Sequence, residues 1–314
     1  KIKQEFQMKD SGPAAFLLGM KIDQTINHIS LSQELYINSI LNHYNILRTE
    51  KSNTPLQPNI KLDLASDSEK AEFGKLNENY RKLIGSLNYL STATRPDITY
   101  AVSVLSLFLE EPGIIHWRAG RLVLKYLNTT RQVGLKFEKP VNVQQSLVSY
   151  SDADWGNCPF TRRSITGLVC LNRNHLIIWK CKKQQTVSLS TTEAEYKGLS
   201  DSVKETVWLK NTINEIFNVK ISKIPLFNDN LGAIDLAYNR SNHNNFRTKH
   251  MDLRYHSIRE KLEDEIISLS YINTNQMLAD FLTKSVGKTK LRSALSSLGI
   301  VSCADLSVLS KGGC

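Results

Sequence analysis

From residue 146 onward, the chain carries a regular series of strand-like and helical patterns. Three strand-like runs come first, a long helical pattern follows, and shorter strands and helices then alternate. The expected elements, in chain order, are strands at 146–152, 165–171 and 175–181, a helix at 191–217, a strand at 224–228, helices at 230–238 and 253–263, a strand at 265–272 and a helix at 275–284. This order predicts an α/β fold in which helices flank a mixed five-stranded sheet.

The first 140 residues have a different, mainly helical pattern. Pro96 separates two of the expected helices, because its ring disfavours α geometry at the preceding residue, and Asp97 is expected to cap the second one. The expected elements are a β-hairpin at 16–33, a helix at 34–46, a polar linker at 52–70, helices at about 72–93, 97–110 and 115–128, and a strand at 134–137.

Length and patterning together predict two domains and a tail. The chain of 314 residues suffices for about two domains, and we expect a helical region at 1–140 and an α/β domain at 146–285. Residues 286–314 resemble a weakly ordered tail with room for one short helix. The sequence begins at Lys1 without a Met or a secretory signal, so we expect a fragment or a piece processed from a longer protein.

Bulk composition excludes some classes of protein and leaves others open. No apolar run reaches the ~18 residues that a membrane-spanning helix needs. Five cysteines without a C-x₂-C pair indicate neither a disulfide framework nor a zinc site, which favours reduced thiols in an intracellular compartment. The net charge of +10 is spread over both halves of the chain. It is compatible with a phosphate-bearing partner, and equally with a basic soluble protein.

Four acidic residues in the second half occupy separate sequence contexts where a small α/β nuclease would need metal ligands. They are Asp152, Glu195, Asp229 and Asp280. Carboxylates without a His or Cys partner suit hard cations such as Mg²⁺ or Mn²⁺. Two such ions can activate a water molecule and stabilise a leaving oxygen during phosphodiester hydrolysis.

Each of these carboxylates also has a structural interpretation. Asp152 ends a strand and can be a solvated carboxylate, and Asp154 points to the same face, so spacing alone does not separate the two. Asp229 stands where a helix N-cap is favoured. Asp280 can lie on the exposed face of its helix. Before Glu195, the spacing of Ser190 and Glu193 matches a capping box, which assigns the capping role to Glu193.

Several ordered motifs make the chain similar to one known family. It resembles a ribonuclease H domain and, more closely, the C-terminal part of the Pol polyprotein of Ty/copia-type retrotransposons, over roughly residues 1–285. In the second half the resemblance rests on Tyr150–Trp155, Ser190–Tyr196, Asn228–Asn230, Lys249–His256 with Arg259-Glu260, and Ala279–Lys284. Upstream it rests on Phe16–Gly19, Tyr80–Leu90, Thr94–Ile98 and His116-Trp117.

The resemblance implies an enzyme that cuts the RNA strand of an RNA–DNA hybrid. It implies that the four carboxylates bind two Mg²⁺ or Mn²⁺ ions, and it adds His250 and His256 as candidates for proton transfer during product release. The alternative for both histidines is that they pack or position the last helix. The implied partners are the hybrid and the upstream polymerase region of the polyprotein. The implied location is intracellular, in a cytoplasmic virus-like particle with access to the nucleus.

One departure from the family pattern limits the expected activity. Reverse transcriptases carry a Tyr-x-Asp-Asp turn in the palm, and the sequence contains no Asp-Asp pair. Residues 1–140 would then supply thumb-like and connecting elements, and DNA synthesis by this chain alone is not expected. Two alternatives to a nuclease are a remnant that only binds nucleic acid or braces a subunit, and an integrase or transposase. The latter would need the Glu last in chain order, whereas Glu195 comes second.

Overall fold

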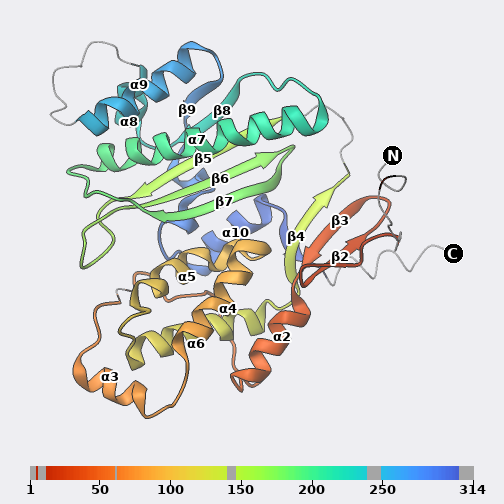
Figure 1. Cartoon of the computed structure of the whole chain (residues 1–314), viewed down its shortest axis with the longest axis vertical. Helices are drawn as coiled ribbons and strands as arrows, with labels where there is room; N and C mark the ends of the chain where they lie inside the picture. The colour runs from red at the N-terminus through yellow and green to blue at the C-terminus, as the bar shows by residue number, and fades with distance from the viewer. Residues whose placement is uncertain (1–4, 6–11, 61, 140–145, 239–248, 304–314) are drawn as a thin grey trace.

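The computed structural model describes residues 5, 12–60, 62–139, 146–238 and 249–303 (Figure 1). These residues form two five-stranded sheets. Helices cover both faces of the sheet with the longer strands, which is built by the second half of the chain. Within the described part of the chain, we find no helix with the length and apolar content to cross a membrane.

The second half of the chain builds the mixed sheet that its patterning predicted. The strand order is β7-β6-β5-β8-β9, in which β5, β6 and β7 are antiparallel neighbours and β8 and β9 run parallel to β5. The strands are β5 (Leu147–Asp154), β6 (Ile165–Asn172), β7 (His175–Lys183), β8 (Ile224–Asn228) and β9 (Ile267–Tyr271). The parallel pairing of β5 with β8 brings the C-terminal ends of both strands to the same edge of the sheet, which positions the site described below.

One face of this sheet is covered by the long helix α7, together with α8 and α9 (Figure 1). The apolar positions Tyr196, Leu199 and Val203 of α7 recur at helical spacing and pack with Leu168 and Leu226 of the sheet. The helices are α7 (Thr191–Phe217), α8 (Leu231–Tyr238) and α9 (Lys249–Glu263). The predicted loop at 241–250 falls mostly outside the described residues, and α9 begins earlier than the expected residue 253.

The opposite face of the sheet is covered by helices from the first half of the chain (Figure 1). Leu83 and Leu87 are fully buried in one apolar cluster that also contains Val169 of β6 and Leu176 of β7. Burial of each such side chain contributes about 1.5–3 kcal/mol. The helices are α4 (Tyr80–Ala93), α5 (Thr99–Leu105) and α6 (Ile114–Thr129). The core is therefore continuous across the predicted division at 140–145, and the domain boundaries stay a prediction.

The second sheet, which has the shorter strands, contains strands from both ends of the chain. Its order is β1-β2-β3-β4-β10, antiparallel throughout, and Ile300 pairs with Leu135. Its strands are β1 (Phe16–Leu17), β2 (Met20–Gln24), β3 (His28–Ser32), β4 (Val133–Glu138) and β10 (Ile300–Ser302), and the adjoining helices are α2 (Glu34–His43) and α10 (Lys288–Ser297). The prediction of a weakly ordered tail is wrong for 288–302, because Leu291 and Leu295 of α10 are buried in the core. The short helix expected there is confirmed.

Two predictions for residues 16–93 were wrong in detail. The hairpin has an additional strand, because Leu18 and Gly19 adopt positive φ angles of 48° and 73° and split the first run. The helix expected at 72–93 is two helices, α3 (Asp67–Gly74) and α4, each with its own N-cap. Ser66 forms a capping box with Glu69, and Asn79 accepts from the backbone of Lys82.

The segment after Pro96 also differs from the prediction. It forms α5 (Thr99–Leu105) between two 3₁₀ turns, η1 (Pro96–Ile98) and η2 (Ser106–Phe108). Asp97 lies inside η1 and caps none of these three elements. The carboxylate of Asp97 is instead paired with the guanidinium of Arg95 at 2.6 Å in the interior. A buried ion pair with Arg95 and a hydrogen bond from Tyr126 therefore take the side chain that local capping rules would have used.

The helix predicted at 275–284 is replaced by two 3₁₀ turns, η4 (Thr274–Gln276) and η5 (Asp280–Leu282). The apolar residues Met277, Phe281 and Leu282 are all buried, although they do not lie on one face of an α-helix. Gly167 of β6 permits this close approach, because a Cβ there would lie 2.8 Å from Thr283 Cγ2 and 2.9 Å from the Ala279 carbonyl oxygen. The turn that carries Asp280 is thereby held against the sheet.

Candidate metal centre

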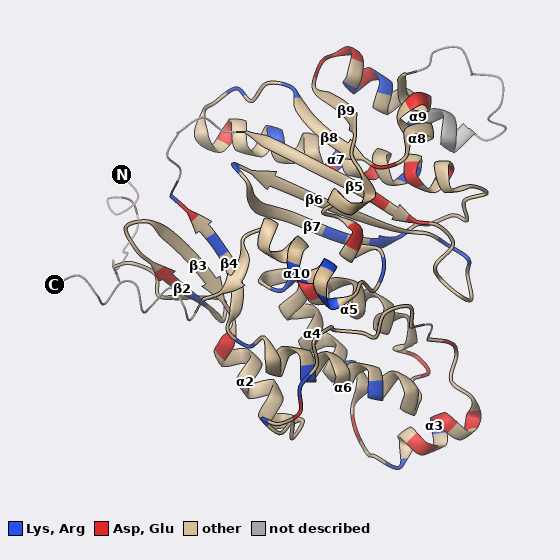
Figure 2. Ribbon diagram, turned by 180° about the vertical axis from the view of Figure 1, so that it is seen from behind, with Lys and Arg blue, Asp and Glu red and all other residues tan. Residues whose placement is uncertain are grey.

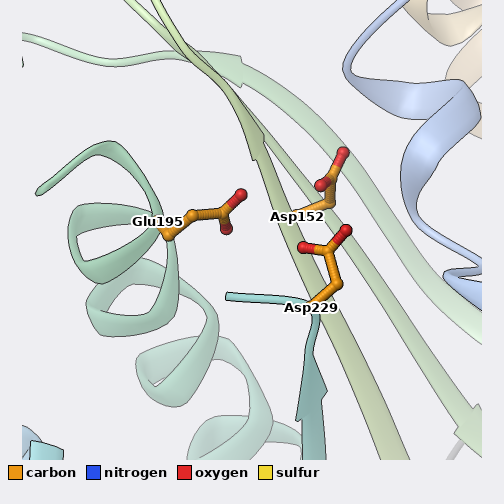
Figure 3. A group of neighbouring side chains, drawn as sticks. All are labelled: Asp152, Glu195 and Asp229. Atoms are coloured by element: carbon orange, nitrogen blue, oxygen red, sulfur yellow. The ribbon is translucent and has the colours of Figure 1, made fainter. Parts of the chain in front are cut away.

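Three of the four predicted carboxylates meet at the edge where β5 and β8 end. Asp152 comes from β5, Glu195 from the first turns of α7, and Asp229 follows the last residue of β8 (Figure 3). One carboxylate oxygen from each residue lies within 4.8 Å of the other two. Among the residues that the structure describes, this is the one group of three or more acidic, His or Cys side chains with metal-ligand spacing.

Burial distinguishes this group from a solvated acidic patch. Asp152 is 3% exposed and Glu195 is 5% exposed. Burial, together with the nearby charges of Asp280 and Asp229, raises the pKa of Asp152 to about 7. Burial also raises the pKa of Glu195 well above its ordinary value, and the charge of Asp152 adds to this effect. Like charges held together in a low-dielectric site create a strong demand for a cation.

Asn228 orients Glu195. The side chain of Asn228 is fully buried, and its Nδ2 donates to Glu195 Oε2 at 3.0 Å and to the Ser151 carbonyl oxygen at 2.9 Å. Its Oδ1 accepts from the backbone N–H of Asn230 at 2.9 Å. The carboxylate of Glu195 is therefore fixed to the backbone of β5 and to the end of β8, where Asp152 and Asp229 stand.

Asp229 does not have the N-cap role that its sequence context suggested. The side chain of Asn230 caps α8, because its Oδ1 accepts from the backbone N–H of Ala233 at 2.9 Å. Asp229 instead turns toward the acidic group, and its Oδ2 accepts from the hydroxyl of Thr274 at 2.7 Å. The structural interpretation of Asp229 is thus replaced by a position beside Asp152 and Glu195.

Asp280 lies beside Asp152 but outside the group of three. Its side chain is only 2% exposed, so the alternative interpretation of an exposed outer face is wrong. Its carboxylate forms two ion pairs. Lys284 Nζ lies 2.7 Å from Asp280 Oδ1, and Lys290 Nζ contacts Asp280 Oδ2. Thr283, on the same turn, donates its hydroxyl to Asp152 Oδ2. The turn at Asp280 therefore supplies a carboxylate, a hydroxyl donor and positive charge to the site.

The alternative ligand Asp154 and the capping residue Glu193 have other surroundings. Asp154 is only partly buried and lies outside the group that contains Asp152. Burial raises the pKa of Asp154, whereas a hydrogen bond with Asn157 lowers it. Glu193 serves the start of α7, because its backbone N–H bonds to Ser190 Oγ at 3.1 Å and its carboxylate accepts from the Leu189 N–H at 2.7 Å. It reaches one residue further back than a capping box requires.

The two candidate histidines both fall on α9. His256 is exposed, and it is not part of the acidic group. The side chain of His250 lies outside the described residues. Arg254, between them, contacts Asp201 of α7 at 2.9 Å and so fastens α9 to α7. The roles of His250 and His256 in proton transfer stay predictions.

No role was predicted from the sequence for four residues at this site, namely Asn228, Thr283, Lys284 and Lys290. The spacing of Lys284, four residues after Asp280, was a visible signal for an ion pair. Nothing in the sequence indicated Lys290, because its contact depends on the way α10 packs.

No family model matches the chain. A solved ribonuclease H1 isolated from compost is 12% identical, and the match covers 48% of this chain and 99% of that one with a TM-score of 0.34. The order of strands and helices in residues 147–271 defines a ribonuclease H-like fold.

Sequence relatives identify the family. The retrovirus-related Pol polyprotein from transposon TNT 1-94 of Nicotiana tabacum is 38% identical over 307 residues, which is 95% of this chain and 22% of that protein. A transposon Ty5-1 protein of Saccharomyces cerevisiae is 34% identical over 65% of this chain and 67% of its own length. The chain belongs to the family of copia-type retrotransposon Pol polyproteins. It spans about a fifth of the length of the curated Pol polyproteins that it matches.

Proposed function

We propose that this chain hydrolyses the RNA strand of RNA–DNA hybrids with the help of two divalent cations. Membership of the Pol family and the ribonuclease H-like fold support a role in nucleic-acid hydrolysis. The observation that carries the proposal is the meeting of Asp152, Glu195 and Asp229, which are distant in sequence and lie within 4.8 Å of one another.

The donors present suit the implied ions. All three are carboxylate oxygens, which Mg²⁺ and Mn²⁺ prefer, and Asp280 adds a fourth carboxylate beside Asp152. When bound, two such ions supply an activated water molecule and stabilise the leaving oxygen. The raised pKa values of Asp152 and Glu195 indicate a site whose carboxylates lack enough positive charge of their own.

The side chains around the carboxylates act by positioning. Asn228 holds one oxygen of Glu195, and the carboxylate of Glu195 points toward Asp152 and Asp229 (Figure 3). Thr283 fixes one oxygen of Asp152. Cation binding requires deprotonated carboxylates, so loading the site at neutral pH releases the proton that the raised pKa of Asp152 retains.

Charge and family membership support the proposed substrate class. Lys and Arg occur on both halves of the molecule (Figure 2), and the net charge of +10 favours a polyanionic partner. The 2′-hydroxyl is the group that would mark the RNA strand for cutting. We extend the proposal to residues 1–140 as a thumb-like and connecting region, whose helices cover the second face of the sheet. DNA synthesis by this chain alone is not expected.

The experiment is a cleavage assay on the full 314-residue chain with strand-labelled substrates. We expect Mg²⁺-dependent cutting of the RNA strand in an RNA–DNA hybrid, no cutting of duplex DNA, and loss of activity with a chelator. Binding of the hybrid without any cutting in Mg²⁺ or Mn²⁺ would contradict the proposal. That result would favour a module that only binds nucleic acid.

A further inference from the structure

Asp280 is approached by ammonium groups from two different elements. Lys284 follows Asp280 by one helical turn, and its Nζ lies 2.7 Å from Asp280 Oδ1. Lys290 belongs to α10, and its Nζ contacts Asp280 Oδ2. The side chains of the two lysines are 40% and 38% exposed, whereas that of Asp280 is 2% exposed. Both lysines therefore reach inward from the surface to the same carboxylate.

The helix that carries Lys290 is fixed by the other half of the molecule. Leu291 and Leu295 of α10 are buried in the apolar cluster that the helices of the first half form. Leu291 also lines a small cavity with Tyr100 of α5 and Phe281 of η5. Acidic and basic segments lie close together around α10 in Figure 2. Lys290 is thus a charge that packing outside the mixed sheet delivers to the acidic site.

The two lysines differ in the carboxylates that they affect. Burial lowers the pKa of Lys284, but Asp152 and Asp280 raise it by more, so its charge serves the acidic group as a whole. The contact that the structure shows for Lys290 is with Asp280 alone. Lys290 can therefore be removed without removing the lysine whose charge acts on Asp152.

We propose that Lys290 tunes the divalent-cation affinity of the acidic site by occupying the Asp280 carboxylate. This inference rests on the proposed function and concerns the control of that same site. A cation that binds between Asp152 and Asp280 must displace the Lys290 ammonium or coexist with its charge. Docking of α10 and loading of the site with cations therefore oppose each other. The divalent-cation requirement of the chain is set partly by the packing of its first half.

The test is the affinity of the full chain for Mn²⁺ at pH 7.5, measured by calorimetric titration. Lys290→Met removes the charge and keeps most of the side-chain length, and Lys290→Arg keeps the charge. Lys288→Met is the matched control, since Lys288 is an exposed residue on the same helix. The repulsion between the +1 charge of the Lys290 ammonium and the +2 charge of a cation about 6 Å away, in a water-like dielectric, corresponds to about a tenfold change in affinity.

We expect Lys290→Met to bind Mn²⁺ about tenfold more tightly than the wild type, while Lys290→Arg and Lys288→Met stay within about twofold of it. Lys290→Gln is a second neutral variant, for use if the Met variant does not fold. Unchanged or weaker binding by a folded neutral variant would overturn the inference. Weaker binding would show that Lys290 only holds Asp280 in place.

The same titration separates this inference from the proposed function. If the wild type binds Mn²⁺ and cuts the hybrid but Lys290→Met behaves as Lys288→Met does, the role of Lys290 is refuted and the nuclease stands. If neither the wild type nor any variant binds Mn²⁺ or cuts, both proposals fail.

Discussion

Two regions of this molecule bury charge, and they neutralise it in different ways. Under the helices of the first half, Arg95 and Asp97 form an ion pair whose side chains are both 0% exposed. Tyr126 donates to Asp97 at 2.8 Å, and Arg95 donates to the Thr130 carbonyl oxygen at 3.0 Å. At the edge of the mixed sheet, by contrast, the nearest neighbours of Asp152 include other carboxylates.

The difference shows which buried charges are structural. Burial lowers the pKa of Arg95, but Asp97 raises it by more, so this pair is balanced within the protein. The acidic group is only partly balanced, by lysines that reach Asp280 at its side. An unbalanced buried charge costs stability, and a cation from solution can remove that cost. We therefore assign a structural role to the first site and a cation-binding role to the second.

The largest expected effect is on catalysis at the acidic site. Glu195→Gln removes a charge and keeps the shape, so hybrid cleavage should fall by at least ~10³-fold, as is typical when a group that acts on the reacting centre is lost. The initial rate of RNA-strand cutting in Mg²⁺ measures this. Glu193→Gln, two residues away, is the control and should retain most of the activity. A cutting rate for Glu195→Gln within tenfold of the wild type would mean a different ligand set.

The second effect is on stability at the balanced pair. Asp97→Asn leaves the Arg95 guanidinium buried without its counter-charge, which should lower the free energy of unfolding by about 3–5 kcal/mol. Urea unfolding followed by circular dichroism measures this change. Asp264→Asn, at an exposed position, should stay within about 0.5 kcal/mol of the wild type. If the two variants were equally stable, the pair would not be structural.

The third effect is on the pH dependence of stability, measured in the absence of divalent cations, that the acidic site imposes. The folded pKa of Asp152, about 7, lies above its unfolded value, so the folded state binds the extra proton. The contribution of Asp152 to stability is then fully present below about pH 4, is lost as the pH rises, and is gone above pH 7. The loss amounts to at most roughly 4 kcal/mol.

Urea unfolding of the wild type and of Asp152→Asn, in chelator at pH 5 and pH 8, isolates this contribution. The wild type should lose stability relative to the variant on going from pH 5 to pH 8, and excess Mg²⁺ at pH 8 should restore it. Parallel pH profiles for the two proteins would show that Asp152 carries no such penalty.

The smallest expected effect concerns the hydroxyl that supports Asp152. Thr283→Val removes a hydrogen bond that lowers the pKa of Asp152, so protons compete better with cations at pH 7. We expect Mn²⁺ affinity to fall about fivefold, in line with about 1 kcal/mol for one hydrogen bond. Thr283→Ser keeps the hydroxyl and should bind as the wild type does. Equal affinity in the Val and Ser variants would remove Thr283 from the account.

Local patterns predicted the elements that carry the site, but not the contacts that complete it. Hydrophobic periodicity was sufficient for β5, β8 and α7, because their buried faces repeat at the period of a strand or a helix. The carboxylates were identified by their positions on those elements and by family motifs. The segment after residue 274 was misassigned as a helix, because its apolar residues pack around Gly167 instead of along one face.

Tertiary packing accounts for the remaining differences. Asp97 follows a proline and has the local signature of a cap, yet a buried guanidinium takes its carboxylate. Lys290 falls in the segment predicted to be a weakly ordered tail, and only the docking of α10 and the pairing of β10 with β4 bring it to Asp280. Asn228 was visible beside Asp229, but its hold on Glu195 requires α7 to lie across the strand ends.

The most direct test of the central claim is a crystal structure of the full chain soaked in Mn²⁺, with anomalous scattering used to locate the ions. We predict an anomalous peak between Asp152, Glu195 and Asp229, with carboxylate oxygens at about 2.0–2.2 Å. Under saturating Mn²⁺, a structure without density there would contradict the claim that these three side chains jointly hold a cation.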